Sequence, residues 1–163
     1  MTHIIRPATI ADAAAICDIY NPYIRDTVIS FETEPVTPEQ MGHRIIDITA
    51  NFPWLVCVDN EQIVGYAYVT KWRARAAYQH AVESSVYLST AAAGKGFGSA
   101  LYRALIEELK KLPVHVVIGG IALPNAASVA LHEKMGYEKV AHFAQVGRKF
   151  DRWIDVGYWQ RVL

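Results

Sequence analysis

A predicted β-strand that runs directly into a glycine-rich turn and a helix is the feature that most constrains the fold of this chain. The strand covers Ala81–Leu88, an amphipathic helix is predicted over residues 96–112, and Gly94, Gly96 and Gly98 lie where the turn leads into this helix. Glycine allows the backbone to approach a ligand closely with its N–H groups turned inward, and a helix N-terminus adds the positive end of its dipole. The pattern predicts either a pyrophosphate-binding turn or a tight strand-to-helix connection that binds nothing.

The spacing of these glycines argues against two other phosphate-binding motifs. A Rossmann dinucleotide-binding unit has G-x-G-x-x-G spacing after its first strand, whereas these glycines lie in mid-chain, after several predicted strands, and are spaced differently. A P-loop ends in Gly-Lys-Ser or Gly-Lys-Thr, and no such sequence closes this turn.

Strand and helix signals alternate along the chain, without a linker, internal repeat or low-complexity segment. Helices are predicted after a capping box at Thr9 and Asp12 and after Thr37, and Pro22 is expected to bend or end the first of them. The predicted order is strand 3–6, helix from residue 10, helix 38–50, strands 54–58, 63–70 and 81–88, helix 96–112, strand 115–121, helix 125–135, and strands 137–147 and 153–162. This order predicts one α/β domain over residues 1–163, with helices packed on a mixed sheet.

Composition narrows the functional classes. The chain has 163 residues, of which 52% are hydrophobic and 20% charged, as expected for one globular domain with its own core. Lys and Arg number 16, as do Asp and Glu, and this zero net charge argues against a nucleic-acid partner. No apolar run approaches the ~20 residues of a membrane span, and the N-terminus does not resemble a signal peptide, so no membrane partner is expected. Cys17 and Cys57 are interpreted as reduced core residues of a cytoplasmic protein.

A second motif lies downstream of the glycine turn. Leu123-Pro124-Asn125 opens a predicted helix that carries Ser128 and is followed by Gly136. Together with the glycine turn, this motif resembles the GCN5-related N-acetyltransferase (GNAT) superfamily. The acyl-CoA loop of that superfamily, Gln/Arg-x-x-Gly-x-Gly/Ala, falls on residues 93–98, where an alanine replaces the Gln or Arg. Because family members bind the pyrophosphate mainly through backbone N–H groups, the loop is still expected to bind it.

The resemblance is closer to one branch of the superfamily and covers nearly the whole chain. Similarity to the phosphinothricin and methionine sulfoximine N-acetyltransferases is carried above all by residues 82–87 (VESSVY), 123–125 (LPN) and 153–157 (WIDVG). It implies a GNAT-like α/β fold, with a mixed, mostly antiparallel central sheet split by an acetyl-CoA cleft and helices on both faces. It also implies a homodimer that transfers acetyl directly from acetyl-CoA to a small amino-acid-like amine, such as phosphinothricin, methionine sulfoximine or methionine sulfone.

The same resemblance implies where acetyl-CoA binds. Backbone groups of Val86 and Leu88 would pair with the pantetheine arm like an added strand, residues 94–99 would hold the pyrophosphate, and Asn125 would bind the end of pantetheine. The residues expected to bind acetyl-CoA are Val86, Tyr87, Leu88, Gly94, Lys95, Gly96, Phe97, Gly98, Ser99, Asn125 and Ser128.

Acyl transfer to an amine needs a base for the ammonium proton and a proton donor for the departing thiolate. Glu83, in an otherwise apolar strand, is the candidate base, and the alternatives are a solvent-facing glutamate or one paired with an arginine. His132 is the candidate proton donor, because imidazole can donate near neutral pH and many superfamily members carry a Tyr near this helix position. The alternative is a histidine that only lines the pocket or packs. Tyr87 and Tyr137 are further candidates for the proton donor, and the alternative for both is a place in the aromatic core.

Five residues are predicted to bind the acceptor: Phe31, Glu32, Arg73, Arg75 and Tyr78. Paired guanidinium groups suit a carboxylate or phosphinate, because each can give two parallel hydrogen bonds. The resemblance places the segment with Arg73 and Arg75 in the substrate pocket. This segment can come from the same chain or, across a dimer interface, from the partner chain. The residues by themselves also fit a solvated basic loop.

Two other functions stay open at this point. One is acetylation of a different metabolite amine or of a protein N-terminus on the same fold. The other is a non-catalytic sensor that binds acetyl-CoA but releases no CoA thiol with any amine. No metal is expected, because the histidines show no metal-ligand spacing with a cysteine or carboxylate.

Overall fold

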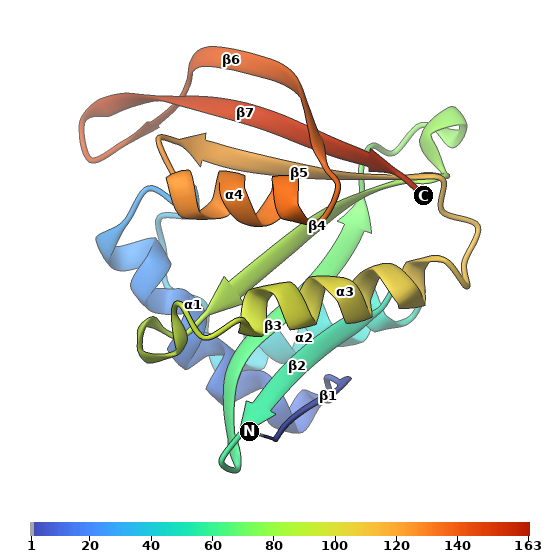
Figure 1. The fold of residues 1–163 in the computed structure, drawn as a ribbon. Helices are drawn as coiled ribbons and strands as arrows, with labels where there is room; N and C mark the ends of the chain where they lie inside the picture. The colour runs from blue at the N-terminus through green and yellow to red at the C-terminus, as the bar shows by residue number, and fades with distance from the viewer. Residues whose placement is uncertain (1) are drawn as a thin grey trace.

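The computed structural model describes residues 2–163 and contains one seven-stranded sheet in the order β1-β2-β3-β4-β5-β7-β6 (Figure 1). Every neighbouring pair is antiparallel except β4 and β5, which are parallel. The strands are β1 (His3–Pro7), β2 (Trp54–Asp59), β3 (Gln62–Lys71), β4 (Ala81–Leu88), β5 (Val116–Leu123), β6 (Glu138–Lys149) and β7 (Arg152–Val162). The prediction of a mixed, mostly antiparallel sheet is confirmed.

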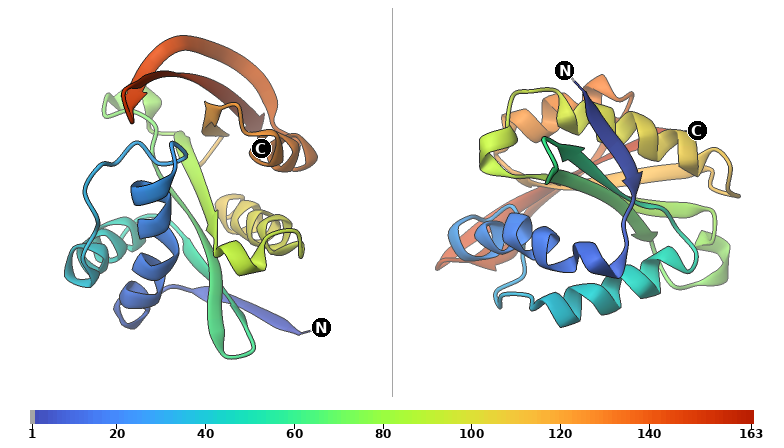
Figure 2. Two further views of the ribbon diagram at one scale, coloured as in Figure 1. Left: turned by 90° about the vertical axis from the view of Figure 1, so that its left-hand side faces the viewer. Right: turned by 90° about the horizontal axis from the view of Figure 1, so that it is seen from below.

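Helices cover both faces of the sheet, also as predicted (Figure 2). They are α1 (Ala13–Asp26), α2 (Pro38–Thr49), α3 (Phe97–Leu109) and α4 (Ala126–Lys134). One buried apolar cluster lies under α1 and α2 and includes Ile16 and Met41. A second cluster lies under α3 and includes Leu101 and Leu105. The two clusters fix the helices on opposite faces, because each helix buries one apolar stripe. No helix among residues 2–163 is long and apolar enough to span a membrane.

Local sequence signals explain where the first two helical segments begin. Thr37 caps α2 through a hydrogen bond of 3.1 Å from the Gln40 amide, and the Gln40 side chain accepts the Thr37 amide in return. A similar capping box joins Thr9 and Asp12 before α1. Helix α3 ends at Leu109, three residues before the predicted limit.

Pro22 does not end α1, because the residues beyond it are held in the helix by tertiary contacts. The helix continues through Pro22 to Asp26. Ile24 is buried, and the Tyr23 hydroxyl donates a hydrogen bond to the Leu88 carbonyl of β4. These contacts outweigh the loss of one helical hydrogen bond at the proline.

The sheet opens between its two central strands. The parallel pairing of β4 with β5 covers only three pairs, of which the last is Glu83 with Ile118. Beyond this pair β4 continues to Leu88 against β3, whereas β5 continues to Leu123 against β7 (Figure 1). The edge of β4 that faces the opening is therefore free to pair with an extended ligand.

Candidate active site

A cleft occupies the opening between β4 and β5. A cavity of about 160 Å³ lies beside Glu83, and a second hollow of about 350 Å³ reaches the glycine turn. The two share five lining residues, so they form one continuous cleft: Ile29, Val86, Tyr87, Asn125 and Ser128. Among the residues predicted to bind acetyl-CoA, the lining also includes Leu88, Gly94, Gly96, Gly98 and Ser99.

The glycine turn has the backbone geometry of an anion-binding site. Gly94 and Gly96 have φ values of +77° and +84°, a left-handed conformation that other residues rarely adopt. Gly96 is the N-cap of the 13-residue helix α3, so the free N–H groups of the helix N-terminus lie at the turn. The Asn125 side chain caps α4 by accepting the Ser128 amide at 3.1 Å, which leaves its own N–H groups to donate into the cleft.

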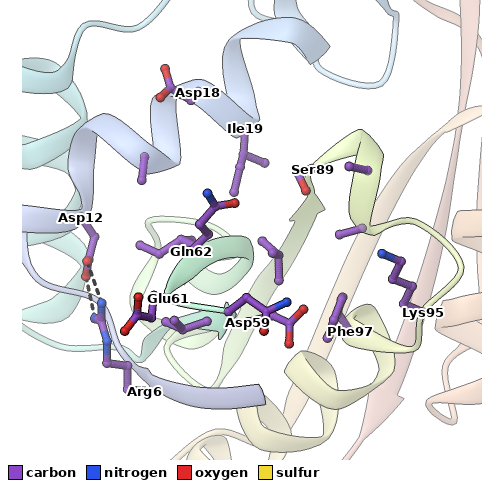
Figure 3. Close-up of a pocket in the computed structure, with 17 residues that line it drawn as sticks. Arg6, Asp12, Asp18, Ile19, Asp59, Glu61, Gln62, Ser89, Lys95 and Phe97 are labelled. Carbon is purple, nitrogen blue, oxygen red and sulfur yellow. Dashed lines mark hydrogen bonds and ion pairs between the residues drawn. The ribbon is translucent and has the colours of Figure 1, made fainter. Parts of the chain in front are cut away.

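Two residues of the predicted acetyl-CoA set point their side chains away from the cleft. Phe97 is 1% exposed and packs in the core under α3. The Lys95 side chain instead lines a separate pocket of about 790 Å³ (Figure 3). Only the backbones of these two residues are left to contribute to the cleft.

The pocket in Figure 3 is larger than the cleft but has no lining residue in common with it. It lies between α1, the β2–β3 hairpin and the segment before α3. Its lining includes the carboxylates of Asp18, Asp59 and Glu61, and its Asp12 side chain is held by Arg6 at 2.8 Å. No histidine, tyrosine or cysteine lines it, so the cleft is the candidate active site.

Glu83 has a half-buried and unpaired carboxylate at the point where the sheet opens. No hydrogen bond or salt bridge to its side chain is present among residues 2–163, which removes the predicted alternative of an arginine ion pair. Burial raises the pKa of Glu83, and the positive charge of Arg73 opposes this shift. Since Val82 and Val86 pack under α3, Glu83 points to the other face of the sheet, toward the side of α1 and α2.

A buried hydrogen-bond network lies on the opposite face, at the next residue of β4. The Ser84 hydroxyl lies 2.9 Å from the Tyr137 hydroxyl and 3.2 Å from the Tyr102 hydroxyl. The Tyr102 hydroxyl in turn lies 2.8 Å from Nε2 of His132, which is 4% exposed. Ser84, Tyr102 and His132 all line the cleft. The network therefore brings hydroxyl and imidazole groups from β4, α3 and α4 to one place.

The network defines the protonation of His132. Nδ1 lies 2.7 Å from the Ser128 carbonyl, which can only accept, so Nδ1 carries a proton. Burial lowers the pKa of His132 and keeps the ring neutral, while the hydrogen bond to Ser128 partly opposes this. Nε2 then accepts a hydrogen bond from Tyr102. The proton between Tyr102 and His132 is therefore carried by the Tyr102 hydroxyl.

Two consecutive glycines of β5 leave space on both faces at this level. A Cβ at Gly119 would lie 2.7 Å from Nε2 of His132. A Cβ at Gly120 would lie 3.0 Å from Cε1 of Tyr158 and 3.5 Å from Oε2 of Glu83. A Cβ at Gly119 would collide with the His132 ring, and a Cβ at Gly120 would require the Tyr158 ring to move by a few tenths of an ångström.

The structure places the two predicted arginines differently with respect to Glu83. The Arg73 guanidinium stacks 4.9 Å from the centre of the Trp72 ring, near enough to Glu83 to affect its pKa. Arg75 precedes a short 3-10 turn, and Tyr78 is 42% exposed in that turn. None of Arg73, Arg75 and Tyr78 lines the cleft. Within one chain, only Arg73 lies near the candidate base.

Phe31 and Glu32 lie beside the cleft rather than in it. Arg44 holds the Glu32 carboxylate with hydrogen bonds of 2.6 and 2.9 Å and lowers its pKa, and Tyr20 donates a third hydrogen bond. The Phe31 ring lies against Gly147 of β6 and leaves no room there for a Cβ. The residue of this segment that lines the cleft is Ile29.

Lys149 fixes the segment around Ile29 to the β6–β7 hairpin. Its buried ammonium donates a hydrogen bond of 2.6 Å to the carbonyl of Ser30. Burial lowers the pKa of Lys149, and the nearby Glu32 carboxylate opposes this shift. The wall of the cleft at Ile29 is thus attached to a hairpin more than 100 residues away in the sequence.

Sequence reasoning missed two residues that line the cleft, Tyr102 and Ile29. Tyr102 had a detectable signal, because its position next to Leu101 puts a polar-tipped aromatic residue on the buried face of a predicted helix. Ile29 lies in an irregular segment just before the predicted acceptor residues Phe31 and Glu32, and its aliphatic side chain gives no chemical signal of its own. No cluster of three or more metal-ligating side chains occurs in the described part of the chain.

Comparison with known proteins identifies relatives along almost the whole chain. Residues 5–157 match the acetyltransferase (GNAT) domain. The chain is 42% identical to a phosphinothricin N-acetyltransferase of Streptomyces viridochromogenes, over 96% of this chain and 86% of that protein. It is 37% identical to an L-methionine sulfoximine/L-methionine sulfone acetyltransferase of Salmonella typhimurium, over 98% and 94%. A phosphinothricin acetyltransferase of Sinorhizobium meliloti, solved with acetyl-CoA, superimposes with a TM-score of 0.96 at 36% identity, over 100% and 89%.

Proposed function

This chain belongs to the GNAT family and is an acetyl-CoA-dependent N-acetyltransferase, and we propose that its acceptor is the amine of a small amino-acid-like compound. Phosphinothricin, methionine sulfoximine and methionine sulfone are the acceptor types that its relatives suggest. The observation that carries this proposal is the unpaired, half-buried Glu83 carboxylate at the opening of the sheet, with the Tyr102–His132 pair on the opposite face.

The residues of the cleft fit acetyl-CoA, which supplies the acetyl group as a thioester. The free edge of β4 at Val86 and Leu88 can pair with the pantetheine amides, and Asn125 has N–H groups to donate. The turn at residues 94–99 presents backbone N–H groups to the pyrophosphate. The carbonyl of Leu88 already accepts the Tyr23 hydroxyl, so its N–H is the better partner for the ligand.

Glu83 is proposed as the base that takes the proton from the acceptor ammonium, directly or through a water. An ammonium has no lone pair, so it must lose this proton before nitrogen can attack the thioester carbonyl. The raised pKa of Glu83 favours the role, because a more basic carboxylate accepts a proton more readily. Its position on the face opposite Ser84 and Tyr102 leaves the other side of the opening for the thioester sulfur.

Tyr102 is proposed to donate a hydrogen bond or a proton to the departing thiolate, and His132 to position it. His132 was predicted as the donor, but its neutral ring presents Nε2 as an acceptor to Tyr102. A proton that leaves this pair for the sulfur would leave from the Tyr102 hydroxyl. His132 would hold that hydroxyl in place through Nε2, and the hydroxyl would turn its single proton from Nε2 to the sulfur as the thiolate leaves.

The proposed activity can be tested by release of CoA thiol, followed with a thiol-reactive dye. Purified protein and acetyl-CoA would be mixed separately with phosphinothricin, methionine sulfoximine, methionine sulfone, common amino acids, a polyamine and a peptide. We expect turnover with the first three compounds. Turnover only with the polyamine or the peptide would contradict the proposed acceptor class, and acetyl-CoA binding without any turnover would favour the sensor alternative.

The proposed base predicts a specific pH dependence. Because burial raises the pKa of Glu83, the acid limb of kcat/KM should lie above the ordinary value of about 4.3 for a glutamate. Arg73→Gln removes the charge that opposes the shift, so it should move this limb to higher pH. Glu83→Gln should lower kcat by ~10²-fold or more. Arg103→Gln on the exposed side of α3 is the control for loss of a charge. Near-normal turnover of Glu83→Gln at every pH would eliminate Glu83 as the base.

The role of Tyr102 predicts a loss of rate without a loss of cofactor affinity. Tyr102→Phe removes the hydroxyl but keeps the ring, and we expect kcat to fall by ~10- to 100-fold while the acetyl-CoA affinity measured by calorimetry is unchanged. If His132 acts through Tyr102, the Tyr102→Phe/His132→Gln double variant should be no slower than the slower single variant. Fully additive losses of rate would show that the two residues act independently.

We further propose a homodimer that uses the β6–β7 hairpin. Its exposed apolar side chains include Val140, Val146, Phe150 and Trp153, and β6 is an edge strand. Ile4 is the matched control for Val146, because it is similarly exposed (63% against 61%) but lies on the opposite edge strand, β1. In sedimentation experiments Val146→Asp should shift the protein toward the monomer, whereas Ile4→Asp should not. A wild-type protein that sediments as a monomer would refute the dimer.

The chain is also proposed to be one cytoplasmic domain. All seven strands belong to one sheet, and the matched family covers residues 5–157, which supports a single domain. Cys17 and Cys57 are buried free thiols, as expected in a reducing compartment. Limited proteolysis and cell fractionation would test these two assignments.

A further inference from the structure

We propose that a hollow at the turn of the β6–β7 hairpin binds a small organic carboxylate, with Lys149 as the cation that receives it. This hairpin hollow has a volume of about 500 Å³ and lies between the end of α1, the segment that follows α1 and the hairpin turn. It shares no lining residue with the cleft, so it is a second site, and its proposed ligand does not follow from the N-acetyltransferase activity. Its lining consists of Ile24, Arg25, Thr33, Pro35, Arg148, Lys149, Phe150 and Asp151.

Lys149 is a buried cation without a carboxylate partner. It is 6% exposed, and a lysine is rarely so buried unless an anion pairs with it. Its ammonium donates one hydrogen bond, to the Ser30 carbonyl, and takes part in no salt bridge among residues 2–163. Two of its three N–H donors therefore have no partner in that part of the chain. Burial lowers the pKa of Lys149, as expected for an ammonium that lacks a neighbouring anion.

The carboxylate of Glu32 does not compensate this charge, because its oxygens are already bonded. Glu32 opposes the fall in the Lys149 pKa through its charge but forms no salt bridge with Lys149 in the described residues. Arg44 donates to both Glu32 oxygens, at 2.6 and 2.9 Å, and the Tyr20 hydroxyl donates to one of them. The free donors of Lys149 are thus available to an anion from outside the chain.

The charges that line the hairpin hollow favour an anion. Arg25 and Arg148 add two guanidinium groups to the Lys149 ammonium, whereas Asp151 is the one carboxylate in the lining. Arg148 lies 3.9 Å from the fully exposed carboxylate of Asp151, and Arg25 pairs with an exposed aspartate at 3.0 Å. Exposed pairs of this kind contribute little to stability, so both guanidinium groups can turn to a ligand at little cost.

The rest of the lining favours a ligand with an apolar body. Ile24, Pro35 and the exposed Phe150 ring offer apolar contact beside the cations. Inorganic phosphate would leave this surface unused, and an ammonium group would be repelled by the three cations. An aliphatic carboxylate satisfies both parts of the hairpin hollow, because its oxygens accept from Lys149 and its chain covers the apolar side chains.

The hairpin hollow is attached to the wall of the cleft through Lys149. The Ser30 carbonyl, which accepts the hydrogen bond from Lys149, follows directly after Ile29, and Ile29 lines the cleft. A carboxylate bound at Lys149 would thus share its ammonium with the segment that forms this wall.

The test titrates isotope-labelled protein with hexanoate and, separately, with hexanamide, which has the same chain but no charge. In amide NMR spectra hexanoate should shift the signals of residues 24–25, 33–35 and 148–151, whereas hexanamide should not. Lys149→Met should weaken hexanoate binding by ~10-fold or more, and Lys149→Arg, which keeps the charge, should restore most of it. Arg148→Gln, at the surface, should weaken it by ~3-fold and decides the test if Lys149→Met does not fold.

Two control variants should bind hexanoate as wild type does. Arg103→Gln removes an exposed arginine from α3, and Arg73→Gln removes the guanidinium near Glu83, which separates the hairpin hollow from the acceptor site. Shifts confined to the cleft, or equal affinity of the wild type and both Lys149→Met and Arg148→Gln, would overturn the inference. Because the readout is binding, neither result depends on the acetyltransferase activity.

Phe150 also belongs to the surface proposed for the homodimer, so the titration is repeated with Val146→Asp. The proposal expects both proteins to bind hexanoate. Binding by Val146→Asp alone would show that a second copy of the chain covers the hairpin hollow, and it would overturn the carboxylate site.

Discussion

The geometry of the site depends on the parallel contact between β4 and β5, which ends after three residue pairs. The last pair contains Glu83, and the next residue of β4 is Ser84 at the start of the opening. Because successive side chains of a strand point to opposite faces, the carboxylate and the hydroxyl network separate at this point. One residue step along the backbone thus assigns the proposed amine chemistry to one face of the sheet and the proposed thiol chemistry to the other.

The two faces provide different environments for these two tasks. On one face, the Glu83 carboxylate has no hydrogen-bond or salt-bridge partner among residues 2–163 and borders the cleft. On the other, Ser84, Tyr102, Tyr137 and His132 satisfy one another in a buried network. A satisfied network holds its members in fixed positions, whereas unpaired groups gain their partners from a substrate. The structure therefore fixes the groups on the Ser84 face of the opening and leaves the carboxylate on the Glu83 face available to a substrate.

The sequence predicts the order of the elements, the sheet type and the glycine turn, because these depend on local spacing and on residues close together in the chain. It also singles out Glu83 as the candidate base, since a charged residue in an apolar strand stands out without any knowledge of tertiary contacts. It does not predict that His132 accepts from Tyr102, because that depends on the packing of α3 against α4. It groups Arg75 with Arg73 by proximity in the chain, although only Arg73 lies near Glu83.

The hydrogen bond from Lys149 to Ser30 has a mechanical consequence. It joins the end of β6 to the segment whose Ile29 forms part of the cleft wall, and the contact of Phe31 with Gly147 adds a second point of attachment. The hairpin and this wall are thus attached to each other at two points. A substitution that breaks either contact therefore alters the support of the cleft wall at Ile29 as well as the hairpin.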